Sequence, residues 1–269
     1  MSLGIAVKAP EGIVLAADSR VTLTTQRQLP GSENLLSENS SFDNATKLLI
    51  VNSQSHAGAI TYGVGAILTP QPRTLNSFIS EFEATIVNRN RMLVEEFAIE
   101  LSTFYLNHWT IGNNSIIPGF DIHFLVGGYD INDPFGKIFE FSIPNNPTPV
   151  EQVVNQFGAR WGGQHEFLDR LINGFEFSLP SEIRTLLNLS QPQTDQISSH
   201  LLSRYASPVP WAFLPLQDCV DLSIFLIRTT ITMQRFLTTT RGVGGAIDVA
   251  VIRQSEGLIE LQKKELRGE

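Results

Sequence analysis

Three residues near the start of the chain have side chains that could do chemistry: Ser2, Asp18 and Lys47. The first twenty residues read as a strand, a turn at Pro10-Glu11-Gly12 and a second strand that ends in Asp18-Ser19-Arg20. A buried hairpin that begins here would hold the α-amino group inside the structure. An α-amine has a pKa near 8, so it can act as a base close to neutral pH. The pattern therefore predicts N-terminal nucleophile chemistry.

Lys47 is one of only five lysines, and it stands at the head of the apolar run Leu48–Val51. A buried lysine beside a carboxylate stays charged and lowers the pKa of a nearby hydroxyl. We interpret Lys47 as one half of a partly buried ion pair, with Asp18 as a candidate partner. The alternatives are a strand-edge lysine that reaches water and a strand-end carboxylate that caps a turn. A buried pair can also be purely structural.

Apolar periodicity predicts strands, then two helices, strands, helices and strands again. This order favours α+β layers, with two sheets face to face and helices outside each, which is a four-layer αββα sandwich. The expected strands are 3–8, 13–17, 47–52, 57–62, 121–126, 137–143, 151–155, 245–253 and 258–264, and the expected helices are 73–90, 92–108, 165–173, 181–205 and 216–236.

We expect residues 1–269 to form a single domain, because neither a linker nor an internal repeat is visible. Residues 25–45 are rich in Ser, Asn and Gln and read as a long surface loop. Residues 145–215 form a second long segment, and we expect insertions in both places.

Four motifs carry a resemblance to a known family. They are Gly4-Ile-Ala-Val-Lys8 with Gly12 to Thr22, Thr46-Lys47-Leu48-Leu49-Ile50, Gly63-Val64-Gly65, and Gly244-Gly245-Ala-Ile-Asp248-Val-Ala-Val-Ile252. Together they resemble the proteasome subunit family of the N-terminal nucleophile (Ntn) hydrolases. The resemblance is specific in the first sixty or so residues and near the C-terminus, and elsewhere it rests on element order.

The resemblance implies peptide-bond hydrolysis by an N-terminal residue whose own amine is the base. It also implies that Lys47 and Asp18 tune the nucleophile, and that backbone N–H groups at Gly63 and Gly65 bind the oxyanion. Peptides or proteins would be the substrates, and like subunits would assemble into a ring.

The chain departs from the family at the nucleophile, because the expected N-terminal threonine is missing. Family members place it four positions before the residue that matches Gly4, and only three residues precede Gly4 here. Ser2 would point to the correct face but lie two residues, about 6.6 Å along a strand, too deep. Because serine is small, an aminopeptidase can remove Met1 and expose Ser2. The alternatives are a non-catalytic ring-assembly subunit and a stand-alone amidohydrolase acting on small amides.

The composition of the chain argues against some classes of binding partner. The net charge of −8 argues against nucleic acid and anionic membrane as targets. No stretch reaches the roughly 18 apolar residues of a membrane span, and no secretory signal is visible, so we expect a cytoplasmic protein. Charged residues make up only 17% of the chain. This low share is consistent either with a surface that is partly covered by partners or with a large core.

The remaining polar motifs read as structural. The histidines lack metal-ligand spacing, so we expect no metal and no cofactor. His165-Glu166 with Asp169 reads as a solvated helix start, Arg160 to Gly163 as a loop, and Arg241 to Gly245 as a tight turn. The single cysteine, Cys219, allows no internal disulfide and reads as inert core.

Overall fold

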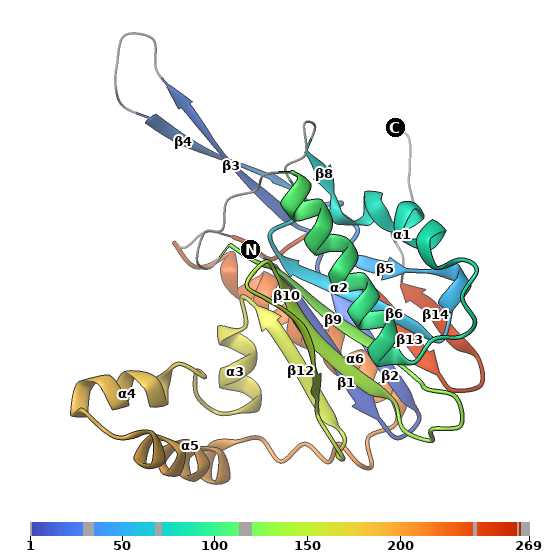
Figure 1. The fold of residues 1–269 in the computed structure, drawn as a ribbon. Coiled ribbons are helices and arrows are strands. Elements are labelled where there is room, and N and C mark those ends of the chain that lie inside the picture. Colours follow the sequence, from blue (N-terminus) through green and yellow to red (C-terminus); the bar gives the residue numbers. More distant parts are fainter. Residues whose placement is uncertain are drawn as a thin grey trace.

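The computed structural model describes residues 2–28, 35–67, 72–112, 120–238, 241–262 and 264. Two five-stranded antiparallel sheets form its centre (Figure 1). The first sheet contains the predicted N-terminal hairpin, and the last two strands of the chain extend it. Its strands, in spatial order, are β12 (Gly158–Gly163), β1 (Leu3–Ala9), β2 (Gly12–Ala17), β13 (Asp248–Arg253) and β14 (Gly257–Gln262).

The second sheet faces the first and is built from the middle of the chain. Its strands, in spatial order, are β11 (Asn146–Gln152), β10 (Lys137–Ile143), β9 (Ile122–Gly128), β6 (Ala57–Gly63) and β5 (Leu48–Ile50). The turn from β5 to β6 contains the short 3₁₀ helix η1 (Asn52–Gln54).

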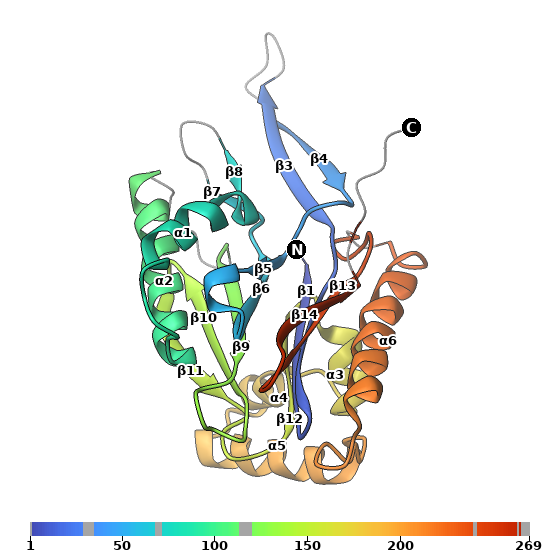
Figure 2. The same ribbon diagram turned by 90° about the vertical axis from the view of Figure 1, so that its right-hand side faces the viewer.

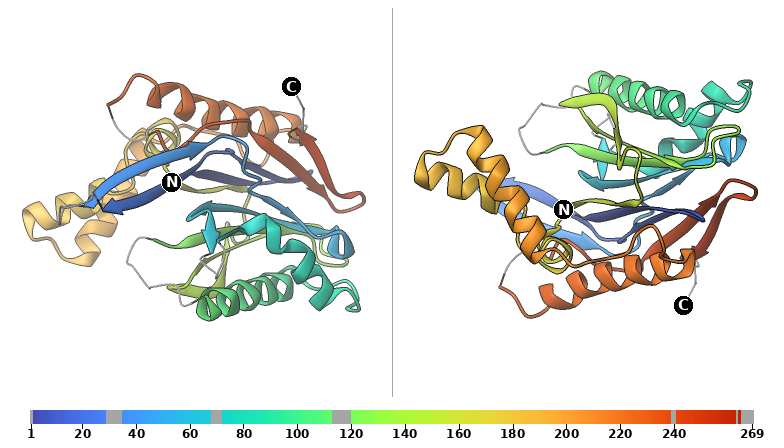
Figure 3. Two further views of the ribbon diagram at one scale, coloured as in Figure 1. Left: turned by 90° about the horizontal axis from the view of Figure 1, so that it is seen from above. Right: turned by 90° about the horizontal axis from the view of Figure 1, so that it is seen from below.

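Helices cover the outer face of each sheet, so the molecule has four layers (Figures 2 and 3). On the second sheet lie η2 (Leu75–Phe78), α1 (Ile79–Ile86) and α2 (Val94–Ile111). On the first sheet lie α3 (Glu166–Ile172) and α6 (Leu216–Gln234). Three apolar clusters fill the spaces between the layers, and the middle one joins the two sheets. The predicted αββα sandwich is present.

Alternation along β1 decides which way Ser2 faces. Leu3, Ile5 and Val7 pack in the cluster beneath α6, whereas Ala6 packs in the cluster between the sheets. Since side chains two apart share a face, Ser2 faces the same inter-sheet space as Ala6.

The predicted loop over 25–45 is wrong for residues 25–28 and 35–42 and holds for 43–45. The strands β3 (Val21–Gln28) and β4 (Leu35–Phe42) form a hairpin that projects from one end of the sandwich (Figure 1). Residues 29–34 lie outside the described residues. Polar composition suggested a loop, but alternating Val, Leu and Thr in β3 supports a strand that pairs across the hairpin.

The loop predicted at Arg160 to Gly163 is also a strand. It is β12, and it pairs with β1 from Leu3↔Gly163 to Lys8↔Gly158. Three glycines in six residues conceal the strand in the sequence, because pairing with β1 rather than local propensity stabilises it.

Two helix boundaries also differ. The helix predicted over 181–205 is two helices, α4 (Leu179–Leu187) and α5 (Gln191–Tyr205), because Asn188 takes the left-handed conformation that ends α4. The helix predicted from 73 begins later, after β7 (Ala66–Ile67) pairs with β8 (Arg73–Thr74). Within the described ranges, no helix is both long and apolar enough to cross a membrane.

Candidate active site

Asp18 lies one residue beyond β2 and is completely buried. Its Oδ1 accepts hydrogen bonds from Lys47 Nζ at 2.5 Å and from the backbone N–H of Leu3 at 2.9 Å. Its Oδ2 accepts the backbone N–H groups of Arg20 at 3.0 Å and Gly244 at 2.9 Å. Four donors from four parts of the chain therefore hold this carboxylate in one orientation. The Asp18 carboxylate therefore both caps the end of the strand and pairs with Lys47.

Lys47 is 4% exposed, so it does not reach water at a strand edge. Burial lowers the pKa of its ammonium, and the neighbouring Asp18 opposes that shift. A second pair lies close by, in which Lys264 Nζ is 2.8 Å from Asp248 Oδ2. Lys264 also donates to Ser19 Oγ at 2.7 Å. The resemblance implied the pair of Lys47 with Asp18, but nothing in the sequence indicated the pair of Lys264 with Asp248.

Ser2 is 3% exposed and lies close to the Lys47–Asp18 pair, because Ser2 and Lys47 line the same small cavity. Its carbonyl oxygen accepts the N–H of Gln164 at 2.8 Å, and the peptide N–H that follows it, on Leu3, donates to Asp18. Ser2 and Lys47 line one small cavity of about 10 Å³. By its distance from Gly4 along the sequence, Ser2 does not occupy the family's nucleophile position. In the structure, only the peptide group between Ser2 and Leu3 separates Ser2 from the Asp18 carboxylate, which accepts Lys47 Nζ.

The two glycines expected to bind an oxyanion both lie near Ser2. Gly63 shares a large cavity with it, and Gly65 shares the small one. Gly63 has φ of +90°, and a side chain there would bring a Cβ within 2.3 Å of the Asp121 carbonyl oxygen, so only glycine fits. Between them, the N–H of Val64 already donates to that carbonyl at 3.0 Å. Oxyanion binding by Gly63 and Gly65 stays a prediction.

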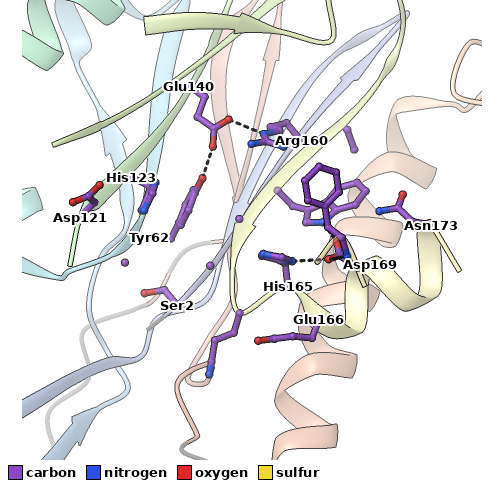
Figure 4. A pocket seen from close by; sticks show the side chains of 17 residues that line it. Ser2, Tyr62, Asp121, His123, Glu140, Arg160, His165, Glu166, Asp169 and Asn173 are labelled. Carbon is purple, nitrogen blue, oxygen red and sulfur yellow. Dashed lines mark hydrogen bonds and ion pairs between the residues drawn. The ribbon is translucent and has the colours of Figure 1, made fainter. Parts of the chain in front are cut away.

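The large cavity, about 660 Å³, opens between the two sheets with Ser2 at one side (Figure 4). Opposite, Tyr62 Oη donates to Glu140 at 2.8 Å, and Arg160 Nε donates to the same carboxylate at 2.7 Å. The Tyr62 ring stacks on His123 with centroids 4.9 Å apart. Burial lowers the pKa of His123, which favours its neutral form. This wall is a fixed polar network that could orient a substrate.

His165 and Asp169 also line this cavity, which corrects the reading of the segment as a solvated helix start. His165 Nδ1 is 2.8 Å from Asp169 Oδ2, and the Asp169 side chain is 3% exposed. The signal in the sequence was the i, i+4 spacing of histidine and aspartate at a helix start. Its orientation could not be inferred, because the preceding strand β12 was not recognised.

The arrangement combines a hydroxyl, a buried ammonium–carboxylate pair and a polar cavity, which are three of the components used in acyl transfer to a serine. Within the described residues, no group of three His, Cys, Asp or Glu side chains could hold a metal ion.

Two solved structures share the fold of this chain. A Gly-1 mutant of Anbu from Hyphomicrobium sp. strain MC1 matches with a TM-score of 0.53 and 13% identity, over 98% of this chain and 86% of that one. Anbu from Yersinia bercovieri, described as an ancestral beta-subunit, matches with a TM-score of 0.52 and 13% identity, over 97% and 87%. No protein-family model and no curated protein matches the chain. The likeness shows the fold alone: the sandwich is of the proteasome type, as predicted.

Proposed function

We propose that this chain is a proteasome-like Ntn hydrolase that cleaves peptide or amide bonds through Ser2 once Met1 has been removed. One observation carries the proposal: Asp18 Oδ1 accepts both Lys47 Nζ and the N–H that follows Ser2. The proposal is also supported by the cavities, since Ser2 lines the large one and shares the small one with Lys47.

The chemistry follows from these positions. The free α-amine of Ser2 would take the hydroxyl proton as Oγ attacks the carbonyl carbon of the substrate. The ammonium of Lys47, fixed by Asp18, would favour the developing negative charge on Oγ. Backbone N–H groups at Gly63 and Gly65 would stabilise the tetrahedral oxyanion. The acyl group would then pass from Ser2 to water.

The test measures hydrolysis of fluorogenic peptides and of small anilides by the protein with Met1 removed. We expect Ser2→Ala to abolish turnover and Lys47→Met to reduce kcat/KM about 100-fold or more. Lys8→Met is the matched control, because Lys8 is equally buried at the opposite end of β1. Lys47→Arg keeps the charge and serves if Lys47→Met does not fold. Turnover that survives Ser2→Ala would refute the proposal, and activity on anilides alone would favour the stand-alone amidohydrolase.

A second candidate function is a non-catalytic assembly subunit. Large apolar side chains are exposed on the outer helices, among them Leu186 (80%) on α4 and Phe225 (54%) on α6. One structural neighbour is described as a beta-subunit, which suits self-association of this chain as well. Native mass spectrometry would test this: a stable monomer at micromolar concentration would exclude the assembly role.

A further inference from the structure

His165 is oriented as a proton-transfer histidine. Its Nδ1 lies 2.8 Å from Asp169 Oδ2, so the carboxylate accepts the Nδ1–H and fixes that tautomer. The Nε2 atom is then the ring nitrogen that Asp169 does not hold, and it can gain or lose a proton in the cavity.

Asp169 is itself held rigidly. Its Oδ1 accepts Trp161 Nε1–H at 2.9 Å, and its Oδ2 also accepts the backbone N–H of Phe177 at 3.0 Å. A carboxylate bound by three donors, with its side chain 3% exposed, cannot swing away from the ring. A histidine that merely started a solvated helix would not need such support.

The backbone connects this pair to the nucleophile. Gln164 donates its N–H to the Ser2 carbonyl at 2.8 Å, so His165 is one residue from a direct contact with Ser2. A Cβ on Gly163 would lie 1.9 Å from the same carbonyl oxygen, so glycine is required for this close approach. Ser2 and His165 face the cavity from neighbouring walls (Figure 4).

We propose that His165 carries the leaving-group proton: it protonates the departing amine during acylation and takes a proton from water during deacylation. This inference rests on the proposed function, because it needs Ser2 to be the nucleophile. Asp169 is a positioning residue that holds the imidazole.

The proton balance is complete with these groups. Oγ of Ser2 bonds to the carbonyl carbon, and its proton goes to the α-amine. The C–N bond breaks as His165 Nε2–H protonates the nitrogen, which leaves neutral imidazole and a seryl ester. Water then adds to the ester carbon and gives a proton to Nε2. The C–O bond breaks, and Oγ takes its proton back from the α-ammonium. One amide and one water become one acid and one amine.

The charges around His165 suit a proton donor. Asp169 raises the pKa of the imidazole most, Glu166 also raises it, and burial and Arg160 oppose them. Across the cavity lie Glu140, Asp121 and His123. The raised pKa shifts His165 toward its protonated form, which is the form that acylation of an amide requires.

The test compares an anilide with an activated ester of the same acyl group. An anilide needs its leaving nitrogen protonated, whereas a nitrophenolate leaves without help. For His165→Gln we expect anilide kcat/KM to fall about 100-fold or more. The pre-steady-state burst that reports acylation of Ser2 by the ester should change less than about threefold. Steady-state ester turnover after the burst should slow.

A pH profile separates chemistry from structure. The rate of anilide hydrolysis by the wild-type protein should decline at alkaline pH as His165 loses its proton. The burst with the ester should show no such decline. Asp169→Asn should reproduce the anilide loss. His200→Gln is the control, since this histidine is exposed on α5.

The two proposals fail differently. If Ser2 is acylated but His165→Gln cleaves the anilide at the wild-type rate, or slows both substrates equally, only the role of His165 is refuted. If the wild-type protein gives no burst that depends on Ser2, the proposed function fails and the role of His165 fails with it.

Discussion

At the scale of single residues, the Asp18 side chain links four separate parts of the chain by hydrogen bonds. It accepts Lys47 Nζ and three backbone N–H groups while fully buried. Asp18→Asn would leave the Lys47 ammonium unpaired and turn an amide N–H₂ toward groups that are donors. We expect a loss of about 3 to 5 kcal/mol in the free energy of unfolding, measured by chemical denaturation.

A double variant isolates the charge. Asp18→Asn with Lys47→Met removes both ions, so no unpaired charge remains in the interior. We expect it to be more stable than the sum of the two single losses requires. Strict additivity would mean that the ion pair contributes no coupling.

His165 and Asp169 should make stability depend on pH. The bond to Asp169 raises the pKa of His165, so its contribution is complete below the unfolded pKa near 6.5 and is lost as pH rises through the folded value. Burial would raise the pKa of Asp169, but bonds from His165, Trp161 and Phe177 lower it. That contribution is lost only as pH falls through the depressed value.

His165→Gln should therefore lower Tm more at pH 5.5 than at pH 9, by on the order of 2 °C, in calorimetric scans. An equal shift at both pH values would show that the pair does not titrate with folding.

The pairing of Asp18 with Lys47 could be predicted because the motifs around both residues resemble the proteasome subunit family and an apolar strand follows Lys47. The sequence did not allow His165 and Asp169 to be assigned to the cavity. Their i, i+4 spacing is common on solvated helices, and only the pairing of β12 with β1 turns this helix start toward Ser2.

At the scale of elements, β12 holds Ser2 and His165 on neighbouring walls of the cavity. Gly163 has φ of +99°, and a Cβ there would lie 1.9 Å from the Ser2 carbonyl oxygen. Gly163→Ala should therefore separate β12 from the start of β1. We expect a loss of about 1 to 3 kcal/mol in unfolding free energy and the loss of Ser2-dependent hydrolysis.

Gly158→Ala provides the control in the same strand. A Cβ at Gly158 meets only Val153 Cγ1, at 3.1 Å, in a backbone without positive φ. This variant should lose less stability and keep its activity. Equal losses in both variants would show that the contact with Ser2 is not special.

The elements with clear apolar patterns could be predicted, and those stabilised by distant pairing could not. The hairpin of β1 and β2 consists of buried Val, Ile, Leu and Ala, so its periodicity was visible. β12 is half glycine, and the β3–β4 hairpin is rich in polar residues, so the strand conformation of both depends on a partner strand.

At the scale of the whole molecule, the ends of the sequence meet in one sheet. β13 pairs with β2 from Asp248↔Ala17 to Ile252↔Ile13, and Gly244 binds Asp18. We propose that the chain is one domain and unfolds in one cooperative step, so far-UV circular dichroism and Trp fluorescence should give the same denaturation midpoint. Two separate transitions would contradict a single domain.

The most direct measurement is mass spectrometry of the purified protein after reaction with an activated β-lactone, which acylates a nucleophilic hydroxyl without a departing amine. We predict that Met1 is absent and that one acyl group is attached to Ser2. Labelling should disappear in Ser2→Ala and fall strongly in Lys47→Met. A folded protein that retains Met1, or that is labelled elsewhere while Ser2 stays free, would contradict the claim that Ser2, which shares a cavity with Lys47, is a nucleophile.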